Sequence, residues 1–426
     1  MTRLQRTKHT FRAFQYRNYR LYFGGQSLSL IGTWMQRTAV SWVVYTMTHS
    51  PLMLGITAFA SQFPSFLLSL VGGIASDRYN RYKLLLITQT ASMIQAVLLA
   101  ILTFTARYTV WEILSLSVLL GIINAFDVPA RQPLVHEMVQ NKNDLPNALA
   151  FNSSMVNLAR LLGPALSGIV LQRFGAGVCF SLNAVSFLAV IASLLLMKLP
   201  PYKKPFSKKK ATTEFVEGFL YLTKTPSIGM MILMLTLVSL LVLPYNTLLP
   251  VYAKIIFKGD ASTFGYINSF IGLGAVSGAL FLASLKTGSN LKKILLVNTI
   301  IFGFGLVLFS HLTSFPLAMV FAVLCGFGTM SQTTICNTVI QTEAHPNMRG
   351  RVISYFAMSV FGMLPLGSLL IGLVSEHIGA PDTILLEGII ALIIAFAFSK
   401  FLRERKWGKN EQAQLEETEA VAIKQI

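Results

Sequence analysis

Apolar residues along this chain gather in long runs that short polar or basic connections separate. Each run is close to the ~20 residues that a helix needs to cross about 30 Å of hydrocarbon, and such runs recur over the whole length. The pattern predicts an all-α membrane protein with twelve transmembrane helices. The expected helices cover residues 20–47, 51–72, 84–105, 109–127, 148–172, 177–198, 227–252, 262–284, 292–311, 315–338, 352–375 and 383–402.

The longest polar stretch lies in the middle of the chain, from Pro200 to Pro226, and leaves six expected helices on each side. Pro164 and Pro365 occupy corresponding places in the fifth and eleventh helices, each among glycine and other small residues. Together these features predict two pseudo-symmetric six-helix bundles around a pathway at their interface. The expected division is an N-terminal bundle over 1–198, a central loop over 199–226, a C-terminal bundle over 227–402 and a tail over 403–426.

The second part of the central loop has two interpretations. Residues 214–225 place Phe215, Phe219 and Leu222 on one face of a helix, which predicts a short helix on the membrane surface. The alternative is a solvated tether without regular structure. The polar tail turns acidic toward its end and is expected to be disordered.

Composition narrows the class of protein. Hydrophobic residues make up 54% of the chain and charged residues only 12%, with a mean hydropathy of +0.61. Soluble domains contain roughly a quarter charged residues, so too little polar surface is available here and a soluble enzyme is excluded. The cysteines Cys179, Cys325 and Cys336 all lie in apolar runs, which predicts neither a disulfide framework nor a metal site.

The net charge of +18 would suggest nucleic acid if Lys and Arg formed one patch, but these residues follow the topology instead. They gather in the N-terminal segment, in every second connection and in the tail. The other connections contain only Arg107, Arg173, Lys254 and Lys258. Because positively charged connections stay in the cytoplasm, we predict a multi-pass protein of the cell membrane with both termini cytoplasmic and no nucleic-acid partner.

The connection between the second and third helices carries a recognisable motif. It reads Gly73-Ile-Ala-Ser-Asp77-Arg78-Tyr-Asn80-Arg81-Tyr-Lys83. This sequence resembles the signature loop of the Major Facilitator Superfamily, and the resemblance extends over the whole chain with a decayed copy of the loop in the second half. It implies that Gly73, Asp77, Arg78 and Arg81 form a gating loop that latches the halves together. Gly73 is expected to let two helices approach closely.

The fifth helix contains Ala159-Arg160-Leu-Leu-Gly163-Pro164-Ala-Leu-Ser167-Gly168, which resembles the glycine–proline motif of exporters in this superfamily. Pro164 removes a helical hydrogen bond, and Gly163 and Gly168 permit tight packing, so a kink is expected here. Other stretches resemble the branch of enterobactin exporters and macrolide efflux proteins. They are residues 26–36, 124–132, 217–218 and 348–352.

The resemblance implies a function: proton-coupled efflux of a medium-sized, partly apolar compound, such as a drug, macrolide or siderophore, by alternating access. The expected partners are this substrate, protons and the lipid bilayer of a bacterial cell membrane. A monomer without cofactor or metal is expected. An uptake symporter of the same fold is the alternative, and an integral membrane acyltransferase is a third, supported only by the spacing of His377 and Asp382.

The first, fourth, seventh and tenth helices line the pathway in this superfamily. Polar residues in these helices are therefore the candidates for the substrate cavity. They are Gln26, Arg37, Asn124, Asn246 and Asn337.

Charged residues inside the expected helices are few, and each costs roughly 2.5–3.5 kcal/mol at the centre of the membrane. Asp127 and Arg131 lie at the cytoplasmic end of the fourth helix. Because opposite charges at one depth offset each other's desolvation, we predict that they join Asp77 in a charge cluster that breaks and reforms during transport. Arg160, in the fifth helix, is expected in the cavity.

The sequence contains no convincing proton carrier. The candidates are Asp127, Glu112 and Glu387, and both glutamates are expected near the external surface. No carboxylate or histidine is expected deep in the membrane, so proton coupling is implied by the resemblance alone.

Overall fold

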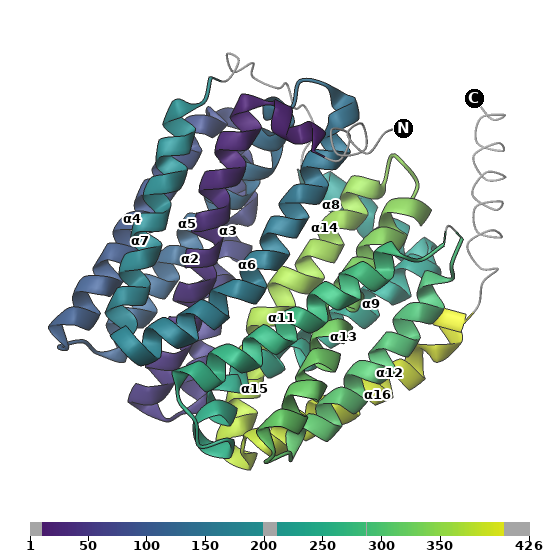
Figure 1. Cartoon of the computed structure of the whole chain (residues 1–426). Helices are drawn as coiled ribbons and strands as arrows, with labels where there is room; N and C mark the ends of the chain where they lie inside the picture. The colour runs from purple at the N-terminus through teal and green to yellow at the C-terminus, as the bar shows by residue number, and fades with distance from the viewer. Residues whose placement is uncertain (1–10, 199–210, 287, 404–426) are drawn as a thin grey trace, which may run out of the picture.

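The computed structural model describes residues 11–198, 211–286 and 288–403. The described part of the chain contains twelve long helical spans. The first six form one bundle, which lies beside a second bundle of six (Figure 1). The predicted fold class is confirmed. The first bundle consists of α2 (Arg17–Thr48), α3 (Pro51–Arg78), α4 (Arg81–Thr105), α5 (Val110–Met138), α6 (Leu145–Phe174) and α7 (Ala176–Leu196), preceded by the short turn η1 (Arg12–Gln15).

The second bundle contains two interrupted spans. Its continuous helices are α11 (Ala261–Ala283), α12 (Leu291–Ser310), α13 (Phe315–Glu343) and α16 (Ala380–Arg403). The seventh span is divided into α9 (Pro226–Leu241), η3 (Leu243–Leu248), α10 (Leu249–Val251) and η4 (Tyr252–Ile256), and the eleventh into α14 (Arg349–Ala357), η5 (Met358–Gly362) and α15 (Met363–Ile378). Pro244, Pro250 and Pro365 lie at these breaks, where proline cannot donate a helical hydrogen bond.

Helix α2 differs from the other spans in polarity. Among the described residues, eleven spans are long and apolar enough to cross a membrane, and α2 is not one of them although it is 32 residues long. It contains Gln26, Gln36 and Arg37 and packs against α3, α5, α6 and α7. Because Gln26 and Gln36 are each 2% exposed, this polarity faces other helices rather than lipid.

Several helices extend beyond their predicted ends, because a helix can continue past the hydrocarbon into the headgroup region. Helix α3 runs to Arg78, so Asp77 and Arg78 lie in its last turn and only two residues connect it to α4. Asn80 has extended backbone and caps α4 by accepting hydrogen bonds from the amides of Tyr82 and Lys83, at 3.0 and 3.3 Å. We call the end of the molecule that carries the α3–α4 connection the basic end, and the end at which α2 connects to α3 the opposite end.

The central segment contains a helix and not a tether without regular structure, whereas its place on the membrane surface stays a prediction. Helix α8 (Ala211–Lys224) packs against α14, where the carboxylate of Glu217 forms an ion pair with Arg351 at 2.5 Å. Gly218 allows this approach, because a methyl group there would lie 3.0 Å from the ring of Tyr355. The expected tail beyond Arg403 lies outside the described residues.

Glycines bring helix pairs within both bundles into backbone contact. A methyl group on Gly72 of α3 would overlap the carbonyl oxygen of Ala125 of α5, and one on Gly274 of α11 would overlap that of Val323 of α13. Helix pairs in membranes depend on such small residues, since lipid offers no hydrophobic drive for helix association. The expectation for Gly73 was wrong: a methyl group there meets nothing within 4 Å, because its neighbour Gly72 faces α5.

We predict that substitution of these two adjacent glycines affects stability to different extents. Gly72→Ala should destabilise the protein by about 1–3 kcal/mol, because α3 and α5 must separate to admit the methyl group. Gly73→Ala should change stability by less than about 0.5 kcal/mol, since its methyl group enters open space. Thermal unfolding of the purified proteins measures both, and equal unfolding temperatures would refute the packing argument.

Candidate functional site

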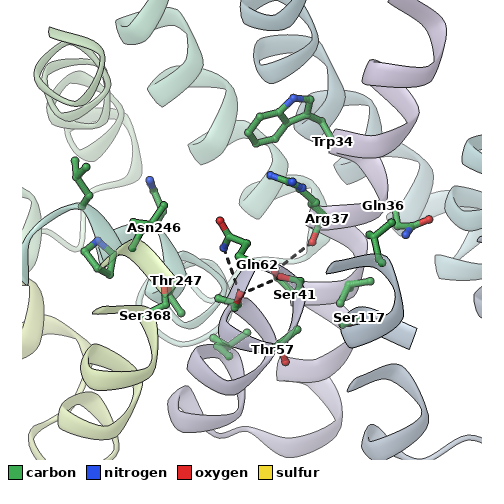
Figure 2. Close-up of a pocket in the computed structure, with 18 of the residues that line it drawn as sticks. Trp34, Gln36, Arg37, Ser41, Thr57, Gln62, Ser117, Asn246, Thr247 and Ser368 are labelled. Atoms are coloured by element: carbon green, nitrogen blue, oxygen red, sulfur yellow. Dashed lines mark hydrogen bonds between the residues drawn. The ribbon is translucent and has the colours of Figure 1, made fainter. Parts of the chain in front are cut away.

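A cavity of about 210 Å³ lies between the two bundles. Helices α2, α3, α4 and α5 line it from the first bundle, and η3 and α15 line it from the second (Figure 2). Its polar lining includes Gln36, Arg37, Ser41, Thr57, Gln62, Asn246, Thr247 and Ser368. The interrupted span therefore brings its irregular turn η3 to a cavity, the setting in which irregular backbone is tolerated at membrane depth.

Two glycine contacts join the bundles at corresponding places in the two halves. In one, a methyl group on Gly168 of α6 would lie 3.0 Å from the Cα atom of Gly265 of α11. In the other, a methyl group on Gly372 of α15 would lie 3.1 Å from the Cα atom of Gly55 of α3. Figure 1 shows α6 and α11 side by side where the bundles meet. These glycines thus bring the backbones of the two bundles into close contact.

Polar contacts close the opposite end of the interface. The carboxylate of Glu376 accepts hydrogen bonds from the Ser50 hydroxyl at 2.8 Å and from the Leu52 amide at 3.1 Å. Gln172 of α6 donates a hydrogen bond to Asp260, just before α11. Each of these contacts joins a residue of the first bundle to one of the second, and each lies next to one of the two glycine contacts.

Asp260 is held in its charged form. Partial burial acts to raise the pKa of Asp260, but hydrogen bonds from Ser262 and Thr263 outweigh it and lower the pKa below its usual value. The same hydrogen bonds cap α11, since the amides of Ser262 and Thr263 lie 2.9 and 3.2 Å from a carboxylate oxygen. An ionised carboxylate is a strong acceptor for Gln172.

Two arginines lie against one tryptophan of α2. The guanidinium carbon of Arg37 is 5.2 Å from the ring centre of Trp34, and that of Arg160 of α6 is 5.3 Å from it. Trp34 and Arg37 also line the cavity, where Figure 2 shows them side by side on α2. Arg160 thus lies beside the cavity wall, although it is not part of the lining.

Gln36 connects the lining to the interior of the first bundle. Its amide group donates to the Gln95 carbonyl oxygen at 2.9 Å, and its own carbonyl oxygen accepts from Asn183 at 2.7 Å. These residues belong to α2, α4 and α7. A satisfied interhelical network of this kind fixes how the three helices pack, so Gln36 has a structural role as well as a place in the lining.

Two of the five cavity candidates, Arg37 and Asn246, line the cavity. Gln26, Asn124 and Asn337 are not part of this lining, and their role in binding stays a prediction. Residues that the sequence analysis did not select are Trp34, Ser41, Thr57, Gln62, Thr247 and Ser368. Trp34 had a usable signal, because it lies three residues before Arg37 and therefore shares its helical face.

The carboxylates of the predicted charge cluster belong to two separate ion pairs at the basic end. Asp127 is 2% exposed, forms an ion pair with Arg131 and accepts hydrogen bonds from Thr88 and Gln89 at 2.9 and 2.7 Å. Asp77 forms its ion pair with a different cation, Arg81, at 3.5 Å. The cyclic rearrangement of these charges stays a prediction.

Arg81 forms an ion pair that has a counterpart in the second bundle. It pairs with Glu137 near the end of α5, at 3.0 Å. In the second bundle, Lys292 at the start of α12 pairs with Glu343 at the end of α13, at 2.7 Å. The decayed copy of the loop therefore keeps this ion pair between corresponding helices.

The glycine–proline motif makes contacts on two sides of α6. A methyl group on Gly163 would overlap the Cβ atom of Trp34, so Gly163 brings α6 against α2. Gly168 and the carbonyl oxygen of Pro164 contact Gly265 of α11. Helix α6 continues through Pro164, and the expected kink stays a prediction.

The sequence analysis did not predict the burial of Glu387 inside the protein, and its expected depth near the external membrane surface stays a prediction. Its side chain is fully buried, and both carboxylate oxygens lack a hydrogen-bond partner within the described structure. Glu387 shares the buried face of α16 with Thr383 and Ala391, one turn away on either side. Its titratable neighbours are Tyr245, Tyr252 and Cys325, from the seventh span and α13.

Comparison with known proteins supports the class of protein that this architecture indicates, a twelve-helix membrane transporter. The structure of a bacterial homologue of the human lysosomal transporter Spinster, inward-facing and unoccupied, shares the fold with a TM-score of 0.70 at 15% identity, covering 93% of this chain and 98% of that one. The family model of transmembrane secretion effectors matches residues 9–425. The chain belongs to this family of the Major Facilitator Superfamily.

Curated relatives cover nearly the whole chain. The staphyloferrin A transporter of Staphylococcus aureus is 27% identical over 90% of this chain and 96% of its own. The macrolide efflux protein A of Streptococcus pyogenes is 23% identical over 89% and 96%, and the enterobactin exporter EntS of Shigella flexneri 24% over 90% and 93%. The predicted branch of the superfamily is confirmed.

The protein is a multi-pass membrane transporter and not an enzyme, as its family and relatives establish. The residues that suggested an acyltransferase have other partners. The ring of His377 bonds to the carbonyl oxygen of Leu373 at 2.9 Å, and Asp382 lies 3.2 Å from the ring of His311.

Asp127 provides a test of the charge groups at the basic end. Asp127→Asn should abolish transport while the protein still folds, because Arg131 loses its counter-charge but the amide keeps the size of the side chain. Asp382→Asn, an exposed position at the opposite end, is the matched control and should transport normally. Gradient-driven movement of macrolides and siderophores in proteoliposomes measures this, and wild-type flux in Asp127→Asn would contradict it.

Proposed function

We propose that this protein exports a medium-sized, partly apolar small molecule by alternating access, coupled to the entry of protons. The observation that carries the proposal is the cavity lined by both bundles and closed at its opposite end by contacts between them. The names of the relatives, an enterobactin exporter and a macrolide efflux protein, favour export. An uptake symporter of the same fold is the alternative.

The proposed topology follows from charge. Arg78, Arg81 and Lys83 at the basic end favour the cytoplasm. We infer that both termini lie in the cytoplasm and that the protein acts as a monomer in a cell membrane. The N-terminal bundle would end near residue 198 and the C-terminal bundle would begin near residue 227. The structure would then be a state closed toward the outside, and transport would require the opposite end to open.

Separating the bundles at a glycine contact should open that end. A side chain on Gly55 meets the carbonyl oxygen of Ser368 at 2.5 Å, so Gly55→Val should favour the outward-open state. A reporter cysteine at Ser41, in the cavity lining, should then react several-fold faster with a membrane-impermeant maleimide added outside intact cells. The native cysteines are buried and give a low background.

The control for this prediction is Gly24→Val, because a methyl group on Gly24 meets nothing within 4 Å. It should leave the labelling rate of the reporter unchanged. Equal rates for Gly55→Val and Gly24→Val would mean that the glycine contact does not govern opening.

Glu387 is the residue that best fits the role of proton carrier. An unpaired carboxylate in apolar surroundings is costly when ionised, and a bound proton removes that cost. Tyr245 links this carboxylate to the cavity, since it follows the lining residue Pro244 and lies near both Glu387 and Arg160. Movement of the seventh span would therefore change the surroundings of Glu387.

Neutralising Glu387 should separate transport from the proton gradient. In liposomes with an imposed pH gradient, Glu387→Gln should lose gradient-driven accumulation but keep exchange of substrate for substrate. Asp382→Asn, on the same helix but exposed, is the control and should keep both activities. Full gradient-driven accumulation by Glu387→Gln would rule out this role.

The same liposomes test the direction of transport. A panel of macrolides and siderophores is offered with the proton gradient in each orientation. Movement of a compound against the flow of protons supports export, whereas movement in the same direction as protons supports the uptake symporter.

A further inference from the structure

The two arginines beside the cavity have no negative partner. Within the described residues, neither Arg37 nor Arg160 has an acidic side chain within 4.0 Å. The Nε atom of Arg160 is buried and lacks a hydrogen-bond partner. The described lining of the cavity contains amides and hydroxyls but neither Asp nor Glu. The cavity therefore has a net positive wall.

This arrangement leaves positive charge at the cavity without a compensating negative group. A cation inside the membrane needs a compensating charge, and here two cations lie close enough to repel each other. The contact of each guanidinium group with the ring of Trp34 compensates only part of that cost. In contrast, Arg131 at the basic end has a carboxylate partner, Asp127.

We propose that the substrate is an organic acid whose carboxylates bind Arg37 and Arg160, with an apolar part of the molecule against Trp34. The inference rests on the proposed transport function and adds the chemical class of the substrate. A guanidinium group presents a planar fork that matches a carboxylate through two parallel hydrogen bonds. Because both forks lie near the same ring, a short molecule with two carboxylates spans them.

The rest of the lining fits an organic anion better than an inorganic one. Asn246 and Thr247 of η3 lie across the cavity from Arg37 in Figure 2 and offer neutral hydrogen-bonding groups from the second bundle. Apolar side chains such as Val40, Leu54 and Leu243 cover the remaining wall. The same positive charge would reject cationic drugs, because no carboxylate in the lining offsets their charge.

Binding to the full-length protein in lipid nanodiscs tests the proposal. The probes are citrate and phthalate, each compared with its neutral ethyl ester and with the cation tetraphenylphosphonium. Quenching of tryptophan fluorescence reports binding, and Trp34→Phe identifies the part of the signal that comes from Trp34. We expect the acids to bind at least tenfold more tightly than their esters, and no competition from the cation.

Substitutions then assign the site. Arg37→Gln and Arg160→Gln should each weaken binding of the acids at least tenfold while leaving ester binding unchanged. Arg37→Lys should give an intermediate loss, because it keeps the charge but not the fork. Arg173→Gln, an exposed cation at the far end of α6, is the matched control and should bind like the wild type. Gel filtration and thermal unfolding confirm that each variant is folded.

Three results would overturn the proposal: no binding of either acid to folded wild-type protein, equal binding of acids and esters, or full binding by both glutamine variants. Chloride and inorganic phosphate form a separate arm, and competition from either at the concentration of the acids would assign the site to an inorganic anion instead. If carboxylates fail to bind but a neutral or cationic compound moves in the liposome assay, the proposed transport function stands and only this inference fails.

Discussion

Close contact between helix backbones is the constraint on which this structure depends. Lipid supplies no hydrophobic drive for helix association, so the helices must gain dispersion energy and polar contacts from each other at short range. Gly72 and Gly274 provide this within the two bundles, and the pairs Gly168–Gly265 and Gly55–Gly372 provide it between them. A cavity lies between the bundles beside these contacts.

The cavity is lined by polar side chains and irregular backbone, which are rare in membrane-spanning helices. Helix α2 is too polar for an ordinary membrane span because it supplies Gln36 and Arg37 to this space, and η3 is irregular where it supplies Asn246. Buried polar groups persist in membrane proteins when they are satisfied or functional. Gln36 is satisfied by two neighbouring helices. For Arg37, we propose that the substrate supplies the partner.

The sequence predicted the number of helices and the two bundles well, because hydropathy and charge are local properties that persist in the fold. It also selected Arg37 and Asn246. It did not predict the burial of Glu387, because depth was judged from distance to the end of the helix and not from the face shared with Thr383 and Ala391. The contact of Arg160 with Trp34 depends on the packing of two helices far apart in sequence, which periodicity cannot reveal.

The ion pair between Glu217 and Arg351 has a consequence for how the chain can be divided. It attaches α8 to α14, and the hydrogen bond from the His345 amide to the Tyr221 hydroxyl at 3.1 Å adds a second attachment. Helix α8 is therefore part of the surface of the second bundle, although it precedes all of its membrane spans. Two co-expressed fragments should assemble best when the break precedes Ala211, because a break after Lys224 would leave that bundle without one of its own packing partners.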